Sequence, residues 1–186
     1  MKKTTLDELR QLLTPACIRT MQIIHLSIMS GATFFFLFIV FMFFTGRAGA
    51  ETDFGAVDTV NTISFLNAAL FVSCLFMSKF LDGWYYSEKR IEAAAAGVSD
   101  RDAASFYIGM VRTGKIIRMA VLEAPAFVGL VACYMAIDSG VMLQYSHYWL
   151  NAASYFGFIY LLASDFPTQD NIIGVFTSRL KFLVVW

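Results

Sequence analysis

The sequence is poor in charged residues, histidine, cysteine and proline. Charged residues make up 15% of its 186 residues, against about 25% in an average soluble domain. The two histidines and three cysteines form no CxxC or HExxH spacing, and no GxSxG, Walker or dinucleotide-binding motif is present. These absences predict a protein that is not an enzyme and that has no metal site and no cofactor. A formal net charge of +0 gives no reason to expect a nucleic-acid partner.

Long apolar runs dominate the sequence instead. Hydrophobic residues reach 58% and the mean hydropathy is +0.63. Four runs approach the ~20 residues that a helix needs to cross a bilayer: Ile23–Phe44, Thr59–Phe80, Ile116–Ile137 and Val141–Ser164. Backbone groups in lipid must be hydrogen-bonded within their own segment, so these runs are expected to be helices. The sequence therefore predicts an all-α membrane protein that forms a single integral membrane domain over residues 1–186.

An internal repeat organises these four runs. Ile18–Phe34 aligns with Val111–Phe127 at an offset of 93, and Phe65–Ala69 aligns with Trp149–Ala153 at an offset of 84. The pattern predicts two tandem transmembrane hairpins that enter the membrane from the same side, as parallel repeats. The two copies are expected to cover residues 5–82 and 99–166.

The two copies differ in bulk along their first helices. Phe36 and Phe38 of the first copy stand where Gly129 and Val131 stand in the second. The smaller residues predict that the third helix is packed closely against its neighbours and that the first helix is more peripheral.

The positive charges predict the orientation. Thirteen of the fourteen Lys and Arg residues precede the first run, lie between the second and third runs or within their facing ends, or follow the fourth, and only Arg47 lies in the other connections. The positive-inside rule then places both termini and the middle segment in the cytoplasm.

Short amphipathic helices are expected on the cytoplasmic side. Thr5–Glu8 and Ser99–Asp102 fit the capping-box pattern, and Thr168 is a candidate N-cap. The leucines that follow Thr5 form one stripe at helical spacing: Leu6, Leu9, Leu12 and Leu13. This stripe indicates either a helix along the lipid headgroups or one packed on the cytoplasmic edge of the protein itself.

Two asparagines occupy equivalent places within the apolar runs. Asn67 and Asn151 both lie in the repeated LNAA element. A buried amide needs a partner, and the flanking alanines permit close helix approach, which favours a hydrogen bond between helices. The alternative is a polar lining for a permeation path.

Glu123 is the carboxylate that lies inside an apolar run. An ionised carboxylate within a transmembrane helix costs about 2.5–3.5 kcal/mol. Arg118 points about 140° away around the same helix, so His25, Gln22 and Ser30 of the first helix are the better candidate partners. One interpretation is a buried pair that fixes helix packing. The other is a protonatable group in an ion path.

The runs QIIHLSIMSGATFF, RTGKIIRMAVLEAPAFVGLVA and FPTQD resemble an uncharacterised family of small four-helix bacterial inner-membrane proteins. The resemblance implies the bacterial cytoplasmic membrane and no catalytic activity. The expected function is that of a non-catalytic subunit, a structural or accessory component of a larger membrane complex, with other membrane proteins and lipid as partners. The alternative is a small ion- or solute-conducting oligomer that uses Glu123.

Overall fold

The structure, a computed structural model, describes residues 3–45, 52–99 and 102–185. It is 86% helical. The α-helices are α1 (Leu6–Leu12), α2 (Pro15–Phe44), α3 (Val57–Tyr85), α4 (Glu88–Ala95), α5 (Ala103–Asp138), α6 (Val141–Gln144), α7 (Ala153–Ser164) and α8 (Gln169–Ser178). Three 3₁₀ helices accompany them: η2 (Phe54–Ala56), η3 (Ser146–Ala152) and η4 (Lys181–Leu183). Two short strands, β1 (Thr4–Thr5) and β2 (Val184–Val185), complete the described elements.

Three helices are long and apolar enough to cross a membrane, which indicates a membrane protein. They span Pro15–Phe44, Phe54–Tyr85 and Ala103–Asp138. Each contains one of the predicted apolar runs and extends beyond it by amphipathic turns, because hydropathy marks the apolar part of a helix and not its ends. The all-α class predicted from the sequence is confirmed.

The fourth apolar run does not form one continuous helix, so that prediction is wrong. Gly140, in the left-handed conformation at φ 73°, precedes the single turn of α6. Tyr145 then leaves the helical region, with φ −126° and ψ 73°, before η3 begins. Side chains hydrogen-bond to two backbone carbonyls of η3. The Asn151 amide donates to the Tyr148 carbonyl at 3.0 Å, and the Ser154 hydroxyl donates to the Asn151 carbonyl at 2.9 Å. Hydropathy is insensitive to this competition for the carbonyls.

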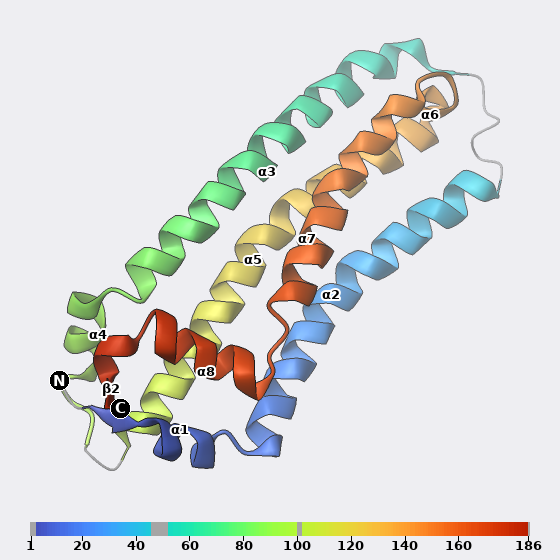
Figure 1. Cartoon of the computed structure of the whole chain (residues 1–186). Coiled ribbons are helices and arrows are strands. Elements are labelled where there is room, and N and C mark those ends of the chain that lie inside the picture. Colours follow the sequence, from blue (N-terminus) through green and yellow to red (C-terminus); the bar gives the residue numbers. More distant parts are fainter. Residues whose placement is uncertain (1–2, 46–51, 100–101, 186) are drawn as a thin grey trace. The chain divides into compact units, whose positions relative to one another are not determined.

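The chain divides into two compact units. Unit 1 comprises Met1–Leu26, Ser78–Met119 and Asp165–Trp186, and unit 2 comprises Ser27–Met77 and Ala120–Ser164. Figure 1 shows the elements of both along the chain. Each unit is described by itself below.

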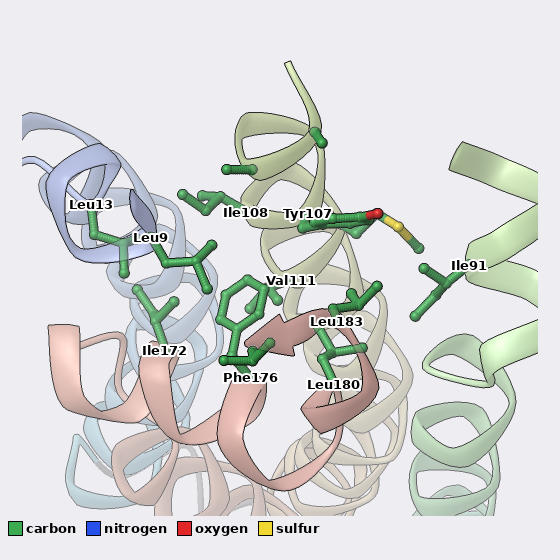
Figure 2. Packing of buried hydrophobic residues seen from close by; sticks show 14 of the residues in the cluster. Leu9, Leu13, Ile91, Tyr107, Ile108, Val111, Ile172, Phe176, Leu180 and Leu183 are labelled. Carbon is green, nitrogen blue, oxygen red and sulfur yellow. The ribbon is translucent and has the colours of Figure 1, made fainter. Parts of the chain in front are cut away.

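Unit 1 has a hydrophobic core made by segments from both ends of the chain. Leu9 and Leu13 of the α1 region face Ile172 and Phe176 of α8, and Val111 of α5 closes the cluster (Figure 2). Beyond the end of α8, Leu180, Leu183 and Val184 are also buried there. This core covers the apolar C-terminal segment.

The burial of the leucines decides between the two alternatives for the leucine stripe. Leu9 is 0% exposed and Leu13 is 3% exposed, whereas Leu12, at the edge of the stripe, is 41% exposed. The second alternative, a helix packed on the protein itself, is therefore correct. The predicted capping box begins α1: the Glu8 N–H donates to the Thr5 hydroxyl at 3.2 Å, and the Thr5 N–H donates to the Glu8 carboxylate at 3.1 Å.

The termini of the described chain meet in unit 1. β1 pairs in parallel with β2, Thr4 opposite Val184 and Thr5 opposite Val185. The predicted N-cap before α8 is also present, because the Thr168 hydroxyl accepts the N–H of Asn171 at 3.2 Å.

Some predicted features involve residues that the structure does not describe. At the second capping box, Asp100 and Arg101 lie outside the described residues. Of the two remaining members, the Ser99 hydroxyl donates to the Asp102 carboxylate at 2.6 Å. Arg47, the one cation of the other connections, also lies outside.

Unit 2 contains most of the apolar helix length, and α5 is its most buried helix. The share of buried residues in the most apolar stretch is 50% for α5, 17% for α2 and 11% for α3. α5 and α7 lie side by side (Figure 1), and Gly129 of α5 allows the contact. A Cβ at Gly129 would collide with the Ser154 hydroxyl and the Asn151 carbonyl. The expectation that the third long helix is more enclosed than the first is confirmed.

Candidate functional site

The two predicted asparagines contact each other in unit 2. The Asn67 amide of α3 donates to the backbone carbonyl of Asn151 at 3.3 Å and to its side-chain oxygen at 3.4 Å. The Asn151 amide in turn donates to the Ser64 hydroxyl at 2.8 Å. Both asparagines are buried. Their contact links α3 to η3 across 84 residues of sequence.

One atom of this pair is unsatisfied within the described part of the chain. The side-chain oxygen of Asn67 is buried and accepts no hydrogen bond from any described residue. A buried amide without one of its partners costs about 1–3 kcal/mol. The pair is therefore a specific but incompletely satisfied link.

Glu123 lies in unit 2 on α5 and is half-buried. Its carboxylate makes no hydrogen bond or ion pair with the described residues of that unit. Ser30 of the same unit is no partner for it, because the exposed Ser30 hydroxyl donates to the Ser27 carbonyl of its own helix at 2.8 Å. Of the three candidate partners considered for Glu123, Ser30 thus makes no hydrogen bond with it among the described residues.

His25 and Gln22 lie in unit 1, where both contact the segment after α7. The buried His25 ring meets the edge of the Phe166 ring, with the ring centres 5.4 Å apart. The Gln22 amide donates to the Pro167 carbonyl at 3.1 Å. These two contacts hold the first third of α2 against the segment Phe166–Pro167.

The most polar feature of unit 1 is an ion-pair network that we call the charged cleft. It is formed by Asp82, Lys115, Arg118, Asp165 and Arg179. Lys115 of α5 is buried, its side chain only 8% exposed, and its ammonium donates to the Asp165 carboxylate at 2.6 Å and to the Asp165 carbonyl at 3.2 Å. An ammonium that is buried this deeply needs such a paired carboxylate.

Two arginines complete the network. Arg118 reaches both carboxylates with its Nη1 atom, Asp165 at 3.4 Å and Asp82 at 3.9 Å. Arg179, which follows α8 directly, reaches Asp82 with its Nη2 atom at 3.4 Å. Arg118 is thus a member of an ion-pair network in unit 1, which explains its place at the start of the third apolar run without any role for Glu123.

The cleft encloses a volume of about 160 Å³. Its wall includes the Tyr86 side chain, whose pKa is raised above the usual range by burial and next by the neighbouring Asp82 carboxylate. The Tyr86 hydroxyl therefore stays protonated. With three cations and two carboxylates, the charged side chains of the cleft carry a net charge of +1.

Sequence reasoning singled out only Arg118 among these five residues. Asp82 follows the second apolar run and Asp165 follows the fourth, so each ends a hairpin at nearly the same place in the repeat. This recurrence of an aspartate after each hairpin is the sequence signal that points to the site. The partners of these carboxylates lie about 30 to 100 residues away along the chain, which periodicity does not reveal.

Among the described residues, no group of three or more His, Cys, Asp or Glu side chains is placed to hold a metal ion. Comparison of the chain with protein-family models, with curated proteins and with solved structures gives no match. The resemblance seen in the sequence therefore remains an expectation.

Proposed function

We propose that this chain is a non-catalytic integral membrane subunit, a structural or accessory component of a larger membrane protein complex. The observation that carries the proposal is the exposed face of α2. Ser30 and Gly31 are exposed there, and a side chain at Gly31 would meet nothing within 4 Å. Small residues on a membrane helix let another helix approach closely.

Large aromatic side chains continue the same face of α2. Phe34, Phe38 and Phe41 are 71%, 46% and 61% exposed. An exposed apolar surface of this kind is covered by lipid or by a partner helix. Near Gly31 the small residues favour a partner helix over lipid. A helix needs a surface without large side chains for close approach, whereas flexible lipid chains can adapt to large side chains.

The test is purification of the tagged protein from native membranes in mild detergent. We expect a reproducible partner protein, and we expect Gly31→Leu to reduce its recovery because the bulky side chain blocks close approach. Gly83→Leu is the matched control, since Gly83 is another exposed helical glycine with nothing within 4 Å. Migration as a lone monomer, or equal loss in both variants, would count against the proposal.

A second candidate function is an ion-conducting oligomer. It is favoured by the Glu123 carboxylate, which lies in the apolar α5 without a described partner in its unit. Ionisable groups inside transmembrane helices often mark ion paths. Vesicles containing the purified protein should then conduct protons or cations, and Glu123→Gln should abolish the flux. Absence of flux, or flux unchanged by this variant, would reject this function.

We further propose that the chain crosses a bacterial cytoplasmic membrane four times, as two parallel hairpins with cytoplasmic termini. The helical residues of η3 and α7 together extend about 32 Å at the rises of 3₁₀ and α-helices, enough for a fourth span. The division between the two units also supports the repeat. It falls after Leu26 and after Met119, which are separated by the same 93 residues as the two copies.

A further inference from the structure

We propose that the charged cleft of unit 1 binds a phosphate group, carried by a lipid headgroup or by a free phosphate compound. The site does not depend on the subunit role proposed above. It rests on the charge, the unused donors, the volume and the sequence position of the cleft.

The charge balance of the cleft favours an anion. Lys115 and Arg118 both contact the Asp165 carboxylate, while Arg118 and Arg179 both contact Asp82. The two carboxylates hold the three cations together but leave one positive charge uncompensated. A monoanionic phosphate group would neutralise the cleft.

The two arginines offer hydrogen-bond donors for such a group. Arg118 contacts the carboxylates through Nη1 and Arg179 through Nη2. The remaining nitrogens of both guanidinium groups make no hydrogen bond with the described residues. A guanidinium presents five N–H donors in a planar fork, which matches the oxygens of phosphate.

The geometry brings these donors together. Both guanidinium groups approach the same carboxylate oxygen of Asp82, Arg179 at 3.4 Å and Arg118 at 3.9 Å. Both guanidinium groups therefore belong to the wall of the same cleft. The cavity of about 160 Å³ corresponds to roughly five water molecules. Asn171 and Ser178 add polar groups to its wall.

The sequence position of the cleft agrees with a lipid headgroup as one source. Asp82 lies two residues after the second apolar run, Asp165 directly follows the fourth, and Lys115 directly precedes the third. Residues at the ends of apolar runs lie at the level of the headgroups. Anionic phosphate is the chemical group present at that level.

Charge variants of the cleft test the proposal in the purified full-length protein. In detergent, titration calorimetry with glycerol phosphate and with inorganic phosphate, at constant ionic strength, measures the soluble source. Native mass spectrometry, which compares retention of phosphatidylglycerol and phosphatidylcholine, measures the lipid source. Arg179→Gln should weaken binding by about tenfold, because it removes a charge-assisted hydrogen bond. Asp82→Asn should strengthen binding, because it raises the net charge of the cleft and releases Arg179.

The matched controls are Arg10→Gln and Asp7→Asn. These residues form an exposed ion pair at 3.5 Å on α1, outside the cleft. Opposite effects of the two cleft variants, with no effect of the controls, support the proposal, and the probe that binds identifies the source. The proposal is overturned if the wild-type protein binds none of the probes. It is also overturned if Arg179→Gln leaves binding unchanged, or if Asp82→Asn, with a helix content and elution volume like those of wild type, weakens it.

Discussion

Gly129 has no room for a side chain. A Cβ there would collide with Ser154 and with the Asn151 carbonyl, and would lie 2.8 Å from the Asn67 amide nitrogen. Because one of these neighbours is backbone, it cannot turn away. We expect Gly129→Ala to lower the free energy of unfolding by about 1–3 kcal/mol, as overpacking does.

Gly31→Ala is the control for this prediction, because Gly31 is also helical but a Cβ added to it would meet no atom within 4 Å. We expect it to be neutral or to stabilise the protein by up to about 1 kcal/mol through helix propensity. Unfolding of both variants in detergent, followed by circular dichroism, measures the difference. Equal stabilities of the two variants would mean that α5 is not in close contact at Gly129.

The asparagine pair is asymmetric. Asn151 bonds to Ser64 and to Tyr148, whereas Asn67 bonds only to Asn151 among the described residues and leaves its own oxygen unsatisfied. Asn151→Ala should therefore cost about 1–2 kcal/mol, and Asn67→Ala clearly less, because hydrogen bonds between membrane helices contribute modestly. Chemical unfolding in mixed micelles would rank the two variants. The reverse order would contradict the assigned contacts.

At the scale of single elements, the docking of α1 depends on Leu9. This side chain is 0% exposed and faces the residues of α8 (Figure 2). Leu9→Ala should cost about 2–5 kcal/mol for the cavity that it leaves. Hydrogen exchange should become faster in both α1 and β2, because these elements share the same core.

Leu12→Ala, at the 41% exposed position of α1, is the matched control and should leave exchange nearly unchanged. If exchange rises equally in the two variants, the loss does not come from the unit 1 core, because of these two residues only Leu9 is buried in that core.

How well each element was predicted follows from the range of the interactions that form it. The capping box at Thr5 and the N-cap at Thr168 were predicted because each involves residues three apart. The three long helices followed from hydropathy alone. The ion pair between Lys115 and Asp165 could not be predicted, because it joins segments 50 residues apart. The break at Tyr145 could not be predicted from hydropathy, because hydropathy does not register the side-chain hydrogen bonds to the carbonyls of η3.

At the scale of the whole molecule, the positively charged residues are concentrated in unit 1. Thirteen of the fourteen Lys and Arg residues belong to unit 1. With the native cysteines replaced by serine, Glu92→Cys of α4 should be protected from a membrane-impermeant maleimide in intact cells. Asp58→Cys, at the start of α3, should be labelled. Both positions are exposed, so protection reports the membrane side. Labelling of Glu92→Cys in intact cells would refute the cytoplasmic orientation.

The closure of unit 1 by both ends of the chain sets an order of events during biosynthesis. Leu9 leaves the ribosome long before Ile172 and Phe176, which cover it. At translation rates of roughly 5–20 residues per second, the delay is about 8–30 s. For that time α1 lacks the α8 part of its apolar cover, and only residues made earlier, such as Val111 of α5, can pack against it. The apolar side of α1 is therefore fully covered only after α8 has been synthesised.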